Sequence, residues 1–237
     1  MTLTYVITGA SRGLGLEFVR QISSQGHTVY ALARNPEASK GLQSLIDGKN
    51  VFAVKLDANS EKSIKEAVDE ININVPGGID ILINNAGIGC DASVNVENAT
   101  KQEYMRIFET NVCGVSDITQ AFLPLLRKRD TKKILNISSV LGSISATETA
   151  NPASVKPPYC VSKAALNMLT KMFANHLADE KFIVYASHPG WVKTDMGGDS
   201  APVEQTDSIA GMLKVLDSVT SKDNGEYYNY TGEKFTW

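Results

Sequence analysis

Short apolar runs without polar alternation recur along the whole chain, and stretches with helical spacing separate them. A strand that is apolar at every position is buried on both faces, as in a parallel sheet covered by helices. The expected strands are Leu3–Thr8, Thr28–Ala33, Val51–Leu56, Ile79–Ile83, Lys133–Ile137 and Ile183–Ser187, with the aromatic stretch Glu226–Trp237 docking on the sheet edge. The pattern therefore predicts an α/β fold with a doubly wound parallel sheet of about seven strands flanked by helices.

Helical spacing is expected near Leu14–Gln25, Ser60–Ile73, Thr100–Arg129, Pro158–Leu177 and Ser208–Asp217. The third of these stretches should bend or break near Thr110 and again near Pro124, because proline removes a backbone donor and crowds the preceding turn. Asp80, at the start of its expected strand, is expected to be solvated. No repeat or linker divides the chain, so residues 1–237 are expected to form a single domain of the Rossmann type.

Composition and charge exclude several classes of function. The chain has 23 basic and 26 acidic residues, a net charge of −3, so nucleic-acid binding has no electrostatic support. No run of about 18 apolar residues is present, so no membrane span is expected, and the first residues do not resemble a signal peptide. Cys90, Cys113 and Cys160 lack metal-ligand spacing, which predicts no metal site, free thiols and a reducing, cytoplasmic location.

A glycine-rich turn, Thr8-Gly-Ala-Ser-Arg-Gly-Leu-Gly15, follows the first expected strand and opens the first expected helix. Gly9 lets the chain turn sharply, Gly13 lets backbone approach a pyrophosphate, and Gly15 lets the helix pack closely. The helix N-terminus then presents free N–H groups and a positive dipole to phosphates. A merely tight turn is the alternative, but the position after the first strand favours a dinucleotide site. The remaining residues expected to contact the cofactor here are Ser11, Arg12 and Leu14.

The charge after the second strand indicates which dinucleotide binds. An NAD site places an acidic residue there to bind the ribose hydroxyls, whereas this chain has Ala33-Arg34 and no acid before Glu37. Arg34 and Arg12 are placed to pair with a 2′-phosphate, which suits the planar fork of a guanidinium. The alternative is two solvated surface arginines. The sequence therefore predicts NADP(H) as the cofactor.

Five motifs occur together in one order: Thr8–Gly15, Asn84-Asn-Ala-Gly87, Asn136-Ile-Ser-Ser139, Tyr159-Cys-Val-Ser-Lys163 and Pro189-Gly190. Over nearly the whole chain they resemble the classical short-chain dehydrogenases/reductases. The stretches 188–198 and 229–237 are similar to those of C-factor-like and Sniffer-like carbonyl reductases. The resemblance implies one dinucleotide-binding and catalytic domain over residues 1–237.

Tyr159 and Lys163 are four residues apart on an expected helix and therefore share a face. A nearby ammonium favours the phenolate, so the pKa of Tyr159 is expected to fall, which would let the phenol give or take a proton. A surface pair is the alternative for such spacing alone. The resemblance implies that Lys163 also holds the nicotinamide ribose, and that Asn111 holds a water linking Lys163 to solvent. Asn111 as a backbone-bonding helix breaker is compatible with that role.

Ser139 follows the strand Lys133–Ile137, where open α/β sheets bind ligands. Its hydroxyl is expected to hold the substrate oxygen and to stabilise developing negative charge. Ser138 is the competing assignment, and the resemblance favours the second serine. The gap of 20 residues from Ser139 to Tyr159 is longer than is usual in the family, and the extra residues, Ser143–Pro158, are expected to form a loop beside the pocket entrance.

The resemblance implies further contacts with the cofactor around the same edge of the sheet. They are expected from Asp57 beside the adenine, and from Asn85, Ala86, Gly87, Pro189, Gly190, Val192 and Thr194. The resemblance implies that Tyr159 and Lys163, besides their catalytic roles, also contact the cofactor. His188 is the alternative base, but no Ser-His-Asp order or H-E-x-x-H motif supports it, so it is interpreted as structural.

These features together predict reduction of an aldehyde or ketone to an alcohol by NADPH. A dedicated 3-oxoacyl-type reductase is one alternative, for which the basic residues 127–133 would be the docking patch. A cofactor-binding signalling or sensor protein is the other. The expected partners are a small carbonyl or alcohol substrate and a second copy of the chain. The assembly is expected to be a homodimer or, failing that, a homotetramer, which pairs through the two long helices around Asn111–Arg129 and Pro158–Leu177.

Overall fold

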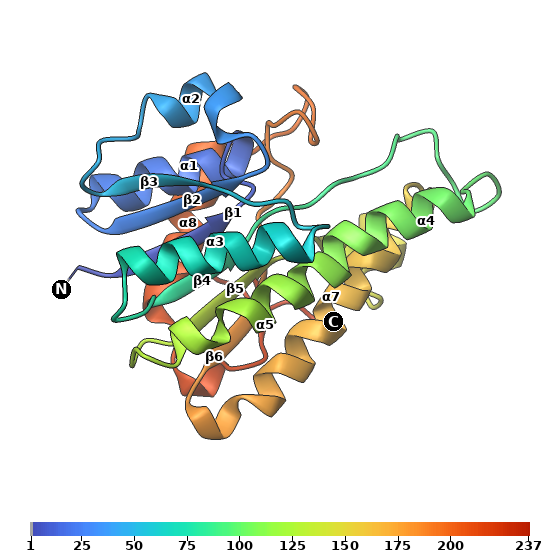
Figure 1. The fold of residues 1–237 in the computed structure, drawn as a ribbon. Helices are drawn as coiled ribbons and strands as arrows, with labels where there is room; N and C mark the ends of the chain where they lie inside the picture. Colours follow the sequence, from blue (N-terminus) through green and yellow to red (C-terminus); the bar gives the residue numbers. More distant parts are fainter. Residues whose placement is uncertain (1) are drawn as a thin grey trace.

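The computed structural model describes residues 2–237 and contains a seven-stranded sheet of order β3-β2-β1-β4-β5-β6-β7, in which every neighbouring pair is parallel (Figure 1). The strands are β1 Thr4–Thr8, β2 Thr28–Ala33, β3 Val51–Lys55, β4 Ile81–Asn84, β5 Lys133–Ile137, β6 Ile183–His188 and β7 Tyr227–Asn229. The order reverses between β1 and β4, which is the switch point of a doubly wound sheet. The predicted fold class is confirmed, and the aromatic stretch supplies the edge strand β7.

Helices cover both faces of this sheet. The long ones are α1 Gly13–Ser24, α3 Glu61–Asn74, α4 Lys101–Phe108, α5 Gly114–Leu126, α7 Pro157–His176 and α8 Gln205–Ser218, and the short ones are α2 Lys40–Gln43 and α6 Thr147–Ala150. No helix within residues 2–237 has the length and apolar character needed to cross a bilayer. The stretch predicted over 100–129 is interrupted near Thr110, where residues Glu109–Cys113 form a π-helical turn. It is not broken at Pro124, because that proline lies in the last turn of α5, where its missing N–H removes a single bond.

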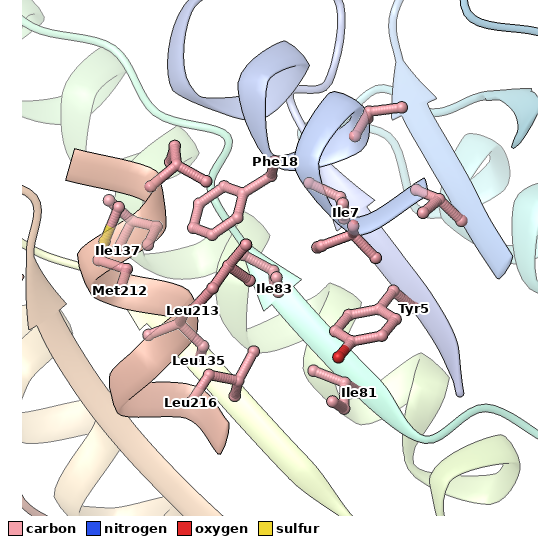
Figure 2. Packing of buried hydrophobic residues seen from close by; sticks show 14 of the residues in the cluster. Tyr5, Ile7, Phe18, Ile81, Ile83, Leu135, Ile137, Met212, Leu213 and Leu216 are labelled. Atoms are coloured by element: carbon pink, nitrogen blue, oxygen red, sulfur yellow. The ribbon is translucent and has the colours of Figure 1, made fainter. Parts of the chain in front are cut away.

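The two hydrophobic cores follow from the alternation of side chains along each strand. On one face, Phe18 of α1 and Met212 and Leu213 of α8 pack over Ile83 and Leu135 (Figure 2). On the other face, residues of α3, α5 and α7 pack over their strand neighbours Leu82 and Ile134. Because both faces are covered, polar side chains of the central strands can reach water or a ligand only beyond the strand ends. The carboxyl ends carry the candidate site.

The amino-terminal edge of the sheet is closed by a buried carboxylate. Asp80 is 5% exposed, and its carboxylate accepts hydrogen bonds from the Thr4 N–H at 2.9 Å and from the Thr131 hydroxyl at 3.0 Å. The expectation that Asp80 is solvated is therefore wrong. These contacts join the starts of β1, β4 and β5 at the edge opposite the candidate site.

Candidate active site

The glycine turn brings the start of α1 close to the ends of β1 and β4. Gly9 has a φ of +65°, and a Cβ at this position would lie 2.9 Å from the Cα of Ala86. A Cβ on Gly15 would lie 2.2 Å from the carbonyl oxygen of Gly9, so any side chain there would push α1 away from the turn. The turn thus depends on glycine at both positions, as the sequence predicts. It places the first N–H groups of α1 at the carboxyl edge of the sheet.

Thr8 and Asn85 fasten this turn to the end of β4. The Thr8 hydroxyl accepts from the backbone N–H groups of Asn85 and Ala86, both at 3.0 Å. The Asn85 amide donates to the carbonyl oxygens of Thr8, at 2.9 Å, and Gly9, at 3.2 Å. The side chain of Asn85 therefore shapes the turn. The contribution of Thr8 was not predicted, although its place at the head of the glycine motif is the signal that could have shown it.

Asn111 and Gly87 lie next to Lys163. Asn111 is fully buried in the π-helical turn, and its amide bonds the N–H and carbonyl of Ile88, at 2.8 and 2.9 Å, and the Ser162 hydroxyl at 3.0 Å. A Cβ on Gly87 would lie 3.3 Å from Asn111 Oδ1 and 3.7 Å from Lys163 Nζ. A π-helical turn of this kind is common at functional sites. The backbone-bonding role of Asn111 is present in the structure.

Lys163 lies on α7, one turn after Tyr159, and its ammonium group lies at the carboxyl end of β5. It is 5% exposed, its Nζ donates to the Ile137 carbonyl at 2.7 Å, and it lies 5.7 Å from the centre of the Tyr159 ring. Burial disfavours the charged form and lowers the pKa of Lys163 to about 8. The pair therefore faces the site and is not the surface pair that was the alternative.

The electrostatics of Tyr159 differ from the prediction. Burial raises the pKa of Tyr159 to about 12, and its hydrogen bond with Ser139 opposes that rise. The expected lowering by Lys163 is wrong for the protein alone, because the ammonium is itself buried and bonds a backbone carbonyl instead of the phenol oxygen. Tyr159 is consequently a protonated phenol at neutral pH.

The two serines after β5 have different surroundings. Ser138 is buried, and its hydroxyl donates to Asn167 Oδ1 at 2.5 Å, which ties β5 to α7. Ser139 caps the short turn Val140–Gly142 through its hydroxyl, which accepts from the Leu141 N–H at 3.2 Å, and its hydroxyl opposes the rise in the pKa of Tyr159. Ser139 is therefore the serine that influences the phenol of Tyr159, whereas the Ser138 hydroxyl is occupied by Asn167.

The remaining predicted cofactor residues gather at the same edge. Arg34 follows β2, Asp57 lies shortly after β3, and Pro189 and Gly190 follow β6. Thr194 lies against the glycine turn, because its Cγ2 is 3.7 Å from where a Cβ on Gly13 would be. The other members of the set, Ser11, Arg12, Leu14, Ala86 and Val192, belong to the glycine turn, the end of β4 and the loop after β6.

His188, at the end of β6, is a half-buried residue beside Phe235, with 5.7 Å between ring centres. Burial lowers the pKa of His188 to about 4, so its ring is neutral at physiological pH. Its Nδ1 has no hydrogen-bond partner among residues 2–237. These surroundings match the structural interpretation given to His188.

Contacts of the C-terminal residues and of the loop before Tyr159 were not predicted. Thr236 accepts from the Ser143 hydroxyl at 2.8 Å through its carbonyl, and Trp237 stacks on Tyr227 with 5.2 Å between ring centres. Farther along, residues Asn95 and Val155 form an antiparallel bridge, so the loops before α4 and α7 lie side by side (Figure 1). The extra residues therefore contain the short helix α6 and are held at both ends.

Comparison with known proteins identifies the family. Residues 4–205 match the model of the short-chain dehydrogenases. The chain is 36% identical to the C-signal protein of Myxococcus xanthus over 68% of this chain and 94% of that protein. It superposes with a TM-score of 0.94 on an NADPH-bound carbonyl reductase from chicken fatty liver, at 35% identity over 100% and 99% of the two chains, and with 0.93 on the carbonyl reductase Sniffer of D. melanogaster, at 30% identity over both full chains. The chain belongs to the short-chain dehydrogenase family and is an oxidoreductase.

Proposed function

We propose that this protein is an NADPH-dependent carbonyl reductase in which Tyr159 donates the proton to the reduced oxygen. The observation that carries the proposal is the joint placement of Tyr159, Ser139 and Lys163 beside the glycine turn. A protein that only binds a dinucleotide needs the turn but has no use for a phenol that lies near a serine and a buried lysine.

The carboxyl edge of the sheet fits a dinucleotide. Gly9 and Gly15 leave backbone exposed where a side chain would collide, and the N–H groups of α1 face that space. The Ser39 hydroxyl donates to the Ser11 carbonyl at 2.5 Å, so the segment after β2 that starts with Arg34 lies against the turn that carries Arg12. Two arginines at this junction suit a 2′-phosphate. Relatives crystallised with NADPH or NADP support the same choice.

The bound cofactor would supply the hydride, and the side chains bind and protonate the carbonyl oxygen of the substrate. The Ser139 hydroxyl holds the carbonyl oxygen and stabilises the negative charge that develops on it. Tyr159, protonated because burial raises its pKa to about 12, gives its proton to that oxygen. The ammonium of Lys163 stabilises the phenolate that remains. A high phenol pKa favours the reduction direction at neutral pH, because oxidation would need the phenolate at the start.

The pH dependence of reduction should report Lys163. Below about pH 8 Lys163 carries its charge, and above it the neutral amine no longer stabilises the phenolate. We expect kcat/KM to be level near neutral pH and to fall above pH 8 by up to about tenfold per unit. Tyr159, with its pKa near 12, stays protonated over this pH range and adds no further change to the pH profile of kcat/KM. A profile that stays level to about pH 10, with circular dichroism showing an intact fold, would contradict the role given to Lys163.

The proposed activity is tested by following the absorbance of reduced nicotinamide with a panel of aldehydes, aromatic ketones, dicarbonyls and quinones. We expect turnover of several small carbonyls and a preference for NADPH over NADH. Activity confined to one steroid or one acyl-carrier thioester would refute the broad substrate range. A preference for NADH would refute the role of Arg12 and Arg34.

The structure gives little support to an acyl-carrier docking patch. Within the basic stretch 127–133, Arg127 forms two bonds with Glu180, at 2.7 and 2.8 Å. Lys128 bonds Asn72 at 2.9 Å, and Lys133 donates to the Leu216 carbonyl at 2.6 Å. These cations are engaged by the chain itself, and the stretch lies at the start of β5, opposite the site. The dedicated 3-oxoacyl reductase is therefore the weaker candidate, and the complete catalytic set disfavours the sensor.

We also propose that the protein forms a homodimer through α7 and α4, whereas the sequence pointed to α7 and the stretch 111–129. Met105 of α4 and Val161, Met168 and Met172 of α7 are between 49% and 64% exposed. Positions 161, 168 and 172 recur at helical spacing and form an apolar stripe, which marks an interaction surface when it is contiguous.

This stripe predicts the effect of a charge at its centre. Met168→Glu is expected to convert a dimer into a monomer in light scattering coupled to size exclusion, because a buried unpaired carboxylate is costly. Ile73→Glu, at a position on α3 that is 78% exposed, is the control and should leave the assembly unchanged. A wild-type monomer, or a dimeric Met168→Glu, would contradict the proposed interface.

A further inference from the structure

Asp195 lies in the loop that connects β6 to α8 and pairs with the glycine turn. Its carboxylate accepts a hydrogen bond from Arg12 Nη1 within an ion pair, although the two residues are 183 positions apart. Arg12 directly precedes α1, and it is one of the two arginines assigned to the 2′-phosphate. The Arg12 guanidinium, which is expected to bind the 2′-phosphate of the cofactor, is thus already paired with the Asp195 carboxylate.

The segment around Asp195 crosses the carboxyl edge of the sheet. On one side of Asp195, the Cγ2 of Thr194 lies 3.7 Å from the position that a Cβ on Gly13 would occupy. On the other side, the Sδ of Met196 lies 3.7 Å from the position that a Cβ on Gly89 would occupy. The segment therefore runs from the glycine turn to the loop after β4.

The loop is braced internally, which fixes where Asp195 stands. The Gly197 N–H donates to the Thr194 hydroxyl at 3.1 Å, and the Trp191 indole donates to the Gly197 carbonyl at 2.8 Å. Val192 and Val203 form a parallel bridge across the base of the loop. These contacts within the loop therefore fix the backbone on both sides of Asp195 at a place opposite Arg12.

We infer that Asp195 competes with the 2′-phosphate of the cofactor for Arg12 and so limits the preference for NADP(H) over NAD(H). This inference rests on the proposed function, because it needs Arg12 to bind that phosphate. A guanidinium presents the same N–H edges to a carboxylate and to a phosphate. Arg12 must release Asp195 to bind the phosphate fully, whereas a cofactor without the phosphate leaves the pair intact.

The expected size of the effect follows from exposure. The side chains of Arg12 and Asp195 are 74% and 77% exposed, and exposed pairs change affinities by at most about fivefold. Arg34 has no ion-pair partner among residues 2–237 and stays available to the phosphate in either case. Asp195 therefore tempers the preference and does not abolish it.

The test is calorimetric titration with adenosine 2′,5′-bisphosphate and with adenosine 5′-monophosphate, which differ only in the 2′-phosphate. Asp195→Asn is expected to tighten the bisphosphate by about two- to fivefold and to leave the monophosphate unchanged. Asp199→Asn, an exposed aspartate in the same loop, is the control for general charge and should change neither ligand. In an Arg12→Ala background, Asp195→Asn should have no effect on the bisphosphate.

The outcomes separate this inference from the proposed function. If Arg12→Ala weakens the bisphosphate but Asp195→Asn fails to tighten it, the competition is refuted and the cofactor assignment stands. If neither Arg12→Ala nor Arg34→Ala changes the ratio of the two affinities, recognition of the 2′-phosphate by these arginines is refuted, and the competition with it. Equal tightening by Asp195→Asn and Asp199→Asn also overturns the inference, because it would show a general charge effect.

Discussion

Replacing Tyr159 by phenylalanine is expected to lower kcat for carbonyl reduction by about two to four orders of magnitude. The change removes one hydroxyl and keeps the ring, so the packing at the start of α7 is preserved. Without the phenol, the site loses the group that is proposed to protonate the oxygen. The measurement is steady-state turnover of a carbonyl substrate with NADPH, together with NADPH binding followed by fluorescence.

Tyr30→Phe supplies the matched control for this variant. Tyr30 lies in β2, is buried and stacks on Phe52 with 5.1 Å between ring centres, and β1 and β4 separate β2 from β5, the strand that leads to Ser139. Its variant should keep both turnover and binding. If Tyr159→Phe bound NADPH and retained more than about a tenth of the wild-type kcat, Tyr159 would not be the proton donor.

Replacing Ser139 by alanine is expected to lower kcat by about 100- to 1,000-fold, the usual loss when one donor to a developing oxyanion is removed. The neighbouring serine provides the comparison within one motif. Ser138→Ala should affect stability instead, because its hydroxyl bonds Asn167 inside the protein, and loss of that bond costs about 1–3 kcal/mol.

Kinetics and thermal unfolding of both serine variants distinguish the two roles. The proposed roles predict the large kinetic loss in Ser139→Ala and the larger fall in Tm in Ser138→Ala. The reverse pattern would assign the substrate oxygen to Ser138 and would contradict the placement of Ser139 beside the phenol.

The strands could be predicted because parallel strands under two layers of helices must be apolar at nearly every position. Val51–Lys55 and Ile183–His188 differ from the expected strands by a single residue at one end. Asp80 was placed in solvent because a charged residue at a strand start is usually hydrated. Its burial depends on Thr4 and Thr131, which no local pattern connects to it.

The candidate site could be predicted as a set of residues but not as an electrostatic environment. The motifs placed Tyr159, Lys163 and Ser139 together, and the structure brings Ser139 to the phenol. The direction of the pKa shift of Tyr159 could not be inferred from spacing, because it depends on how deeply the ring and the ammonium are buried. The pairing of Arg12 with Asp195 was missed for a similar reason, since a contact across 183 residues leaves no trace in local sequence.

Transfer of label from deuterated NADPH to a carbonyl substrate tests the central claim most directly. The protein is incubated with an aromatic ketone or a dicarbonyl and with NADPH deuterated at the transferable position, and the alcohol is analysed by mass spectrometry. The account predicts one deuterium on the former carbonyl carbon for each NADPH consumed by the wild type, and almost no labelled alcohol from Tyr159→Phe. Tight binding of NADPH with no label transferred to any carbonyl of the panel would contradict it.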